Sequence, residues 1–476
     1  MSTPRFRADA FLRLHPLVLA IGLTVAPLLS QAYCDEAVTQ AAGAPATADL
    51  IPLNPAERRD AALQTAGPEQ LADLLRPPVT ASADARGAEH GLTAAQYDLE
   101  QARAGKMPQV GVSANAGRSR YTKYGNGQYD PADVNGVSLN VSGPLYDGGR
   151  IDALTRYRER LLDASGASLG STRERVVRDA LVAVLDRNRY ALQLKVHQQH
   201  VAKLSCLSRS IDQIVAADPG RASEQVQARS SVRQAEIVRD ETQAALRQAE
   251  ARLQRIFDSK VGLWTAVGLP LLELPALEAV LAQVENSPEV RQLHQQADAM
   301  RHLARASAAE QAPQVRWQAG LNSARQATHL TTQSWNIGAT VNYTLSDGGS
   351  GDAAVGAAQE RAEAARRAWE NAVNERTKAA LVYHDTASSA FQRAGRYVDL
   401  LQDSDTLRNA TYVQWIKLGR RSLFDLISAE NEHHQIRIAY VNALHDGYTA
   451  TAQLRTAGEG LLPWAAPDLA TPAAPR

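Results

Sequence analysis

Apolar and polar residues alternate in four short segments of the chain. In the segment 313–323, the apolar residues Val315, Trp317, Ala319 and Leu321 occupy every second position. A period of two residues is typical of a strand with one apolar and one polar face. The same alternation occurs in three more segments, at about 108–117, 134–145 and 334–345. The pattern therefore predicts two hairpins, one in each half of the chain.

Two runs without proline follow the predicted hairpins, and each has the composition of one long helix. They cover 151–217 and 352–417 and are rich in Ala, Arg and Glu. At about 1.5 Å per residue, a helix of this length reaches roughly 100 Å. No globular domain of ordinary size holds such a helix, so we expect a bundle or a coiled coil. Shorter helices are predicted at about 80–104, 222–257, 277–311 and 422–456.

The chain contains an internal duplication. The tripeptides Pro-Gln-Val and Asp-Gly-Gly of the first half recur in the same order about 200 residues later. Each Asp-Gly-Gly stands between a predicted strand and a predicted long helix, where a tight turn is needed. These turns comprise Asp147, Gly148, Gly149, Asp347, Gly348 and Gly349. We therefore predict a first structural repeat at 71–265 and a second at 266–460.

The two ends of the chain differ from the repeats. Residues 1–32 have the pattern of a secretory signal peptide, with arginines before an apolar stretch and small residues near its end. An uncleaved membrane anchor is the alternative, but prolines interrupt the apolar stretch and favour the signal peptide. We expect the segments 33–70 and 461–476, which are rich in Ala and Pro, to be flexible.

Composition and charge argue against several functions. Lys plus Arg and Asp plus Glu both number 51, so no nucleic acid is expected as a partner. The sequence contains no nucleophile motif and no phosphate-binding loop, so we expect neither an enzyme nor a cofactor. Two separate histidine pairs could suggest a metal site: His433 and His434 beside Glu430 and Glu432, and His197 and His200. Because their helices are rich in Gln and Arg, we interpret them as part of a solvated helix face and expect no metal.

The four predicted strands have the length of strands that cross a bilayer. A tilted membrane strand has about 10 residues, polar toward a lumen and apolar toward lipid. Four strands cannot close a barrel, and an open edge in hydrocarbon would leave backbone groups unpaired. Several copies of the chain would therefore contribute four strands each. The alternative is a pair of ordinary hairpins on a soluble protein.

The order of the predicted elements resembles that of the TolC family of outer-membrane efflux and secretion channels. The resemblance extends from about residue 71 to 460 and covers both repeats. It implies a mainly α protein with a transmembrane β part, in which three chains form a twelve-stranded barrel. A long α-helical tunnel continues this barrel into the periplasm. The implied location is the outer membrane.

Within the family, the chain looks most like the outer-membrane component of a type I secretion system. The resemblance implies a homotrimer with outer-membrane lipid, a periplasmic membrane-fusion adaptor and an inner-membrane ABC transporter as partners. The exported substrate would be a protein such as the toxin cyclolysin. A duct for small-molecule efflux is the alternative within the family. A soluble periplasmic coiled-coil adaptor is the alternative from another class of protein.

The segment 418–426 is the part of the chain that is most similar to the family residue by residue. In the family this stretch forms the inner tip of the tunnel, where a turn meets the adaptor. The resemblance implies that Leu418, Gly419 and Ser422 contact that adaptor. The corresponding tip of the first repeat matches the turn but not the apolar-Gly sequence.

The resemblance also implies a periplasmic gate at this tip. Arg421 would pair across helices, and three copies of Asp425 would form an acidic ring around the closed pore. Family members often carry a second aspartate one turn further along, where this chain has Ser428. Independently of the family, Ser422 and Asp425 have the spacing of a helix cap. Capping as the only role of Asp425 is the alternative.

Overall fold

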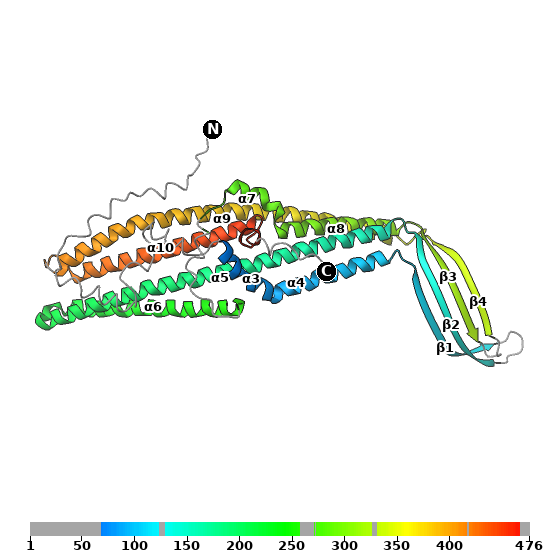
Figure 1. The fold of residues 1–476 in the computed structure, drawn as a ribbon, viewed down its shortest axis with the longest axis horizontal. Helices are drawn as coiled ribbons and strands as arrows, with labels where there is room; N and C mark the ends of the chain where they lie inside the picture. The colour runs from blue at the N-terminus through cyan, green and yellow to red at the C-terminus, as the bar shows by residue number, and fades with distance from the viewer. Residues whose placement is uncertain are drawn as a thin grey trace, which may run out of the picture.

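The protein is a long helical bundle with a small sheet at one end (Figure 1). This computed structural model describes residues 68–122, 129–257, 271, 273–325, 331–416 and 418–466. The predicted signal peptide, most of the segment 33–70 and most of the tail 461–476 lie outside these residues. A mainly α fold with a small β part was predicted, and this fold class is confirmed.

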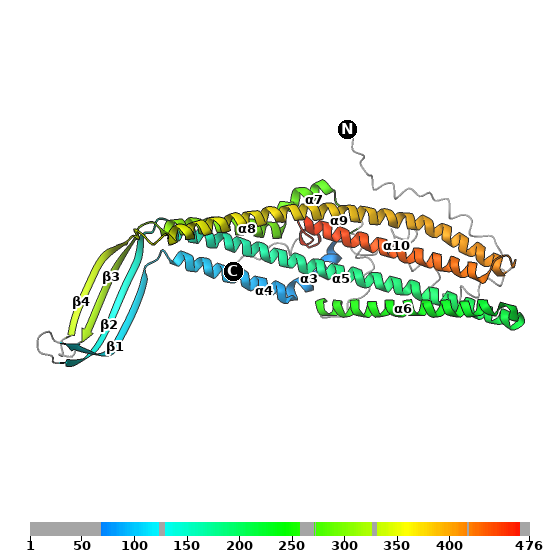
Figure 2. The same cartoon turned by 180° about the vertical axis from the view of Figure 1, so that it is seen from behind.

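Two very long helices run through the bundle. They are α5 (Arg150–Ala217) and α9 (Ser350–Ile416). Each turns back into a shorter antiparallel helix, α6 (Ala222–Phe257) after α5 and α10 (Leu423–Ala457) after α9. Away from the sheet these helices lie side by side in the order α6, α5, α10 and α9, as Figure 1 and Figure 2 both show. The layer therefore consists of two helical hairpins joined along α5 and α10, with α6 and α9 at its edges.

Near the sheet, the shorter helices continue the bundle. α4 (Ala83–Ala104) packs on α5, and α8 (Pro288–Glu310) packs between α5 and α9. α3 (Pro68–Ala81) and the short α11 (Leu462–Ala465) lie near the middle of α5. A 3-10 turn, η3 (Pro219–Arg221), joins α5 to α6.

The prediction of a single helix at 277–311 is wrong, because the helix is interrupted in its first third. The structure has α7 (Leu277–Gln283), a 3-10 turn η5 (Val284–Asn286) and then α8. Ser287 has an extended backbone, with φ −59° and ψ 139°, and Pro288 follows as the first residue of α8. A proline disfavours helical backbone at the residue before it and is well placed at a helix start. Pro288 therefore ends the first helix and begins the next.

Four antiparallel strands form one sheet in the order β1-β2-β3-β4. They are β1 (Gln109–Thr122), β2 (Tyr129–Tyr146), β3 (Gln314–Arg325) and β4 (Thr331–Asn342). β2 of the first half pairs with β3 of the second, so the sheet joins the two repeats. β1 and β4 form its open edges.

The strand ends differ from those predicted by alternation. β1 and β2 extend beyond the predicted 108–117 and 134–145, because their pairing continues to Thr122 and Tyr129 through residues that do not alternate. β4 ends at Asn342 instead of 345, because its last partner, Gln314, is the first residue of β3. Pairing with the neighbouring strand thus sets these ends.

The main apolar core lies at mid-length of the bundle. It contains fully buried leucines from several elements, including Leu75, Leu181, Leu185, Leu271 and Leu461. Glu174 of α5 anchors the chain after α10 next to this core. Its carboxylate accepts hydrogen bonds from the backbone N–H groups of Leu461, at 2.7 Å, and Leu462, at 2.9 Å. Burial raises the pKa of Glu174, while these two bonds oppose the rise.

Replacement of this anchor tests the stability of the mid-bundle core. Glu174→Ala leaves two buried N–H groups without an acceptor, so we expect the free energy of unfolding to fall by about 1 to 3 kcal/mol. Circular dichroism melting in detergent measures the change. The control is Glu159→Ala, which removes an exposed ion pair with Arg103 and is expected to cost less than about 1 kcal/mol. Equal losses in the two variants would contradict the anchor.

Candidate functional site

One face of the sheet is apolar and exposed. The register places Val112 opposite Leu139, Leu139 opposite Leu321, and Leu321 opposite Trp335. An apolar row therefore crosses all four strands. Further exposed apolar side chains lie on the same face, namely Val110, Val137, Ile337 and Val341. Trp335 and Ile337 are each 74% exposed. An apolar patch that continues over a whole sheet marks a membrane or protein contact.

The opposite face of the sheet is polar. Asn140, Gly320 and Asn336 are consecutive partners across β2, β3 and β4. The glycine makes room for the two asparagines, because a Cβ at residue 320 would lie 2.6 Å from Asn336 Oδ1. The hydroxyl groups of Ser113 and Ser138 are 2.7 Å apart on this face. The sheet thus has the two unlike faces that a strand between lipid and water requires.

The two Asp-Gly-Gly turns have the same geometry. Asp147 accepts hydrogen bonds from the N–H groups of Gly149, at 3.0 Å, and Ile151, at 2.6 Å. Asp347 accepts the equivalent bonds from Gly349 and Gly351, at 3.0 and 2.5 Å. Gly148, Gly149, Gly348 and Gly349 all have positive φ angles, between 65° and 90°, which glycine adopts without strain. Each turn therefore caps a long helix where it meets the sheet.

The turn between α9 and α10 lies at the end of the bundle that is far from the sheet (Figure 1). Gly419 has a φ of 59°, which reverses the chain direction. Leu418 is 55% and Phe424 is 59% exposed. The predicted adaptor residues Leu418, Gly419 and Ser422 therefore lie together in an exposed turn with apolar side chains.

Ser422 and Asp425 form a capping box at the start of α10. The backbone N–H of Asp425 donates to Ser422 Oγ at 3.2 Å. Asp425 Oδ2 accepts hydrogen bonds from the Ser422 backbone N–H and hydroxyl, each at 3.0 Å. These bonds hold the pKa of Asp425 below its usual value. Asp425 therefore has a local capping role, and within one chain its charge is maintained at neutral pH.

The predicted gate arginine, Arg421, directly precedes this cap but makes its hydrogen bond to α9. Arg421 Nε donates to Gln414 Oε1 of α9 at 3.3 Å. At the tip of the first repeat, Arg221 instead makes two hydrogen bonds to Glu224, at 3.1 and 2.8 Å. The sequence analysis did not predict the Arg221–Glu224 pair, although an Arg and a Glu three residues apart at a helix start indicate such a pair.

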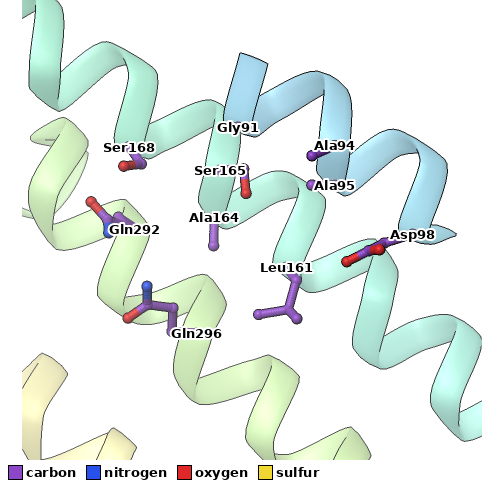
Figure 3. A pocket seen from close by; sticks show the side chains of 10 residues that line it. All are labelled: Gly91, Ala94, Ala95, Asp98, Leu161, Ala164, Ser165, Ser168, Gln292 and Gln296. Atoms are coloured by element: carbon purple, nitrogen blue, oxygen red, sulfur yellow. The ribbon is translucent and has the colours of Figure 1, made fainter. Parts of the chain in front are cut away.

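A groove of about 310 Å³ lies between α4, α5 and α8 (Figure 3). Small and polar side chains line it, including Ala164, Ser165, Ser168 and Gln292. Its one carboxylate, Asp98, accepts a hydrogen bond from Arg158 at 3.1 Å. The groove therefore offers hydroxyl and amide groups but no acid–base pair.

The interpretation of the histidines as a solvated helix face is wrong. His197 and His200 are 7% and 9% exposed, and they contact His434 of α10. The signal for this burial was their spacing, because His197 and His200 continue the alternating three- and four-residue spacing of the buried Leu204, Leu207 and Ile211. Within the described residues, no three His, Cys, Asp or Glu side chains are arranged to hold a metal ion. In the same part of the chain, no helix is long and apolar enough to span a membrane.

Part of the chain matches a known protein family. Residues 81–257 match the profile of a family described as outer membrane efflux protein. This segment runs from α4 to the end of α6, and so covers much of the first repeat. No curated protein sequence matches the chain.

Several solved channels have a similar fold. CusC has a TM-score of 0.74 at 16% identity, over 82% of this chain and 92% of that chain. VceC of Vibrio cholerae has a TM-score of 0.73 at 16% identity, over 82% and 96%. CmeC of Campylobacter jejuni, described as an outer membrane channel, has a TM-score of 0.73 at 13% identity, over 82% and 86%.

The fold is therefore that of the TolC-like channel tunnels. The matched family and the similar structures are described as efflux, membrane or channel proteins. These descriptions agree with the outer-membrane location that the family resemblance implies.

Proposed function

We propose that three copies of the chain form an outer-membrane channel tunnel that serves as a passive export duct. The observation that carries this proposal is the four-stranded sheet, whose apolar face is exposed and whose edges β1 and β4 are open. In hydrocarbon, each unpaired backbone group costs several kcal/mol. Pairing of β1 of one copy with β4 of the next closes the barrel and removes both edges.

The outer helices of the bundle support the same assembly. α6 exposes Val226 and Ile237, and α9 exposes Leu400 and Leu407. These two helices are the edges of the four-helix layer in both views (Figure 1 and Figure 2). Contact between α6 of one copy and α9 of the next covers these side chains and closes the layer into a tunnel.

The oligomeric state tests this proposal directly. We expect a trimer in mild detergent, because closure of both the sheet and the helix layer needs neighbouring copies. Native mass spectrometry of the purified protein measures the number of chains. A stable monomer with intact helices, or recovery from the soluble periplasm without detergent, would favour a soluble coiled-coil adaptor instead.

The exposed turn between α9 and α10 is proposed to contact a periplasmic membrane-fusion adaptor. Leu418, Gly419 and Ser422 are its candidate contact residues, and the exposed Phe424 adds apolar surface beside them. In this arrangement an inner-membrane ABC transporter supplies the energy, and Arg421 and Asp425 control the inner end of the duct.

For the cargo, we propose a protein exported by type I secretion, similar to cyclolysin. The sequence resemblance described above supports this class. Small-molecule efflux is the second candidate, favoured by the description of the family that residues 81–257 match. Deletion of the gene separates the two. Loss of one secreted protein from the medium supports type I secretion, whereas increased drug sensitivity with unchanged secretion supports efflux.

A further inference from the structure

The contact between α5 and α10, here named the α5–α10 seam, joins the two helical hairpins. Toward the tip it is apolar and contains Leu204 and Leu207 of α5 with Leu426 of α10. At mid-bundle it is apolar again, with Leu181 near Tyr448. Between these levels, the buried residues of α5 include four polar ones, Asn188, Gln193, His197 and His200. Over its middle part the seam therefore contains polar contacts next to apolar ones, such as the packing of Leu192 against the cluster with Tyr440 and Val441.

Four histidines meet at this polar level and are named the histidine cluster. They are His197 and His200 of α5 and His433 and His434 of α10. His434 Nε2 lies 2.9 Å from His197 Nδ1, so only one of these two nitrogens can carry the hydrogen between them. The His434 ring also stacks on His200, with 4.0 Å between centroids and 16° between planes. On the α9 side, His433 Nδ1 is 2.9 Å from the Ser404 hydroxyl.

The charges around the cluster favour neutral imidazoles. Arg437 of α10 donates a hydrogen bond to Gln199 of α5 at 2.8 Å. Its positive charge disfavours protonation of His434. Arg408 of α9 faces His433 in the same way. The nearby carboxylates are Asp405 and Glu430, and both face Arg408, at 2.6 and 3.6 Å. Asp405 opposes this effect at His433, but within the described residues no carboxylate raises the pKa of His434.

Burial acts in the same direction. Burial is the largest cause and, together with the neighbouring arginines and histidines, lowers the pKa of His200 and of His433 to about 4 and that of His434 to about 2. Burial also lowers the pKa of His197. An exposed histidine has a pKa of about 6.5. Below that pH, histidines of the cluster that become exposed when α5 and α10 separate therefore bind protons. The closed seam is stable at neutral pH and loses stability progressively as pH falls from about 6.5 to 4.

We propose that the histidine cluster is a pH-sensitive joint, at which acidification separates α10 from α5 and loosens the inner tip of the tunnel. Protonation places cations in a stack with 4.0 Å between ring centroids. Protonation of both His197 and His434 also sets two N–H groups against each other. Since α10 follows directly after Arg421 and carries Asp425 in its first turn, its movement carries this tip. The inference rests on the proposed channel function.

Removal of the titrating groups tests the joint. The double variant His200→Gln/His434→Gln keeps polar side chains, and His200→Phe/His434→Phe keeps the stacked rings. The control is His90→Gln, which changes an exposed histidine of α4. Circular dichroism melting and single-channel recording are carried out between pH 7 and 5 with a chelator present, so that metal binding does not contribute.

In the wild type and the control, we expect the melting temperature to fall and channel opening to increase as pH decreases. Between pH 7 and 5, each histidine that becomes exposed to water should shift the equilibrium between closed and open channels on the order of tenfold toward the open state. Both double variants should retain only part of this pH dependence, because His197 and His433 still bind protons when the helices separate. Because the pKa of Asp425 lies below its usual value, that carboxylate stays ionised here and does not produce the effect.

The outcomes separate the joint from the channel function. Equal pH dependence of melting in the wild type and in both double variants would overturn the joint. So would conducting channels whose opening is independent of pH while their melting depends on the histidines. If melting depends on the histidines but no variant conducts at any pH, the joint is supported and the export-duct function is contradicted.

Discussion

Placing an arginine at Ile337 is expected to prevent most of the protein from assembling in the outer membrane. Ile337 is 74% exposed, and its cross-strand partner is Ala319 on the apolar face. An arginine on the lipid face near the bilayer midplane costs about 2 to 4 kcal/mol. A trimer carries three such residues, so the loss is multiplied in the assembled barrel. Val341→Arg should act in the same direction, because Val341 lies on the same face.

Matched controls are available at neighbouring positions of β4. Asn336→Arg and Asn342→Arg introduce the same side chain one residue away, on the polar face of the sheet. The proposed barrel places these positions toward water, so both variants should assemble almost as well as the wild type. The amount of trimer in the outer-membrane fraction, resolved on native gels, measures the difference. Equal damage on both faces would mean that β4 is not a barrel strand.

The second large effect is expected at the inner tip. If three Asp425 carboxylates surround the closed pore, Asp425→Ala should reduce the preference for cations. One charge about 4 Å from an ion in water contributes about 1 kcal/mol, so the permeability ratio should fall about fivefold or more. Arg421→Ser should loosen the closed state and raise the conductance. Single-channel recordings in planar bilayers measure both quantities.

The capping box makes a sharper control necessary for Asp425. Asp425→Asn removes the charge but keeps a side-chain oxygen that can accept the bonds from Ser422. Ser422→Ala keeps the charge and removes the hydroxyl that accepts from the Asp425 N–H. Loss of selectivity in the first variant alone supports the acidic ring. If Asp425→Asn has normal selectivity and assembles as trimers, Asp425 serves only as a cap.

Acid alone should not reproduce the Asp425 variant at moderately low pH. Like charges in a ring raise carboxylate pKa values, whereas the bonds from Ser422 lower the pKa of Asp425 within each chain. An effect between pH 6.5 and 5 is therefore expected from the histidine cluster, and an effect of Asp425 only at lower pH. The effect of the histidine cluster and that of Asp425 can therefore be distinguished by the pH range in which each occurs.

Some features of this protein are determined by local sequence patterns. The alternation around Val315 and Ile337 predicts which face of each strand is apolar, because side chains of a strand point to opposite faces in turn. The proline-free runs predict α5 and α9, and the repeated Asp-Gly-Gly predicts the turns that cap them. These features depend on residues close to one another in the chain.

Other features depend on which elements meet in space. The pairing of β2 with β3, the burial of Glu174 under Leu461, and the contact of His197 with His434 join residues that are far apart in the sequence. A polar side chain has the same local pattern whether it lies in water or between two helices. Only the packing of α10 against α5 decides that these histidines are desolvated, and desolvation is what makes them sensitive to pH.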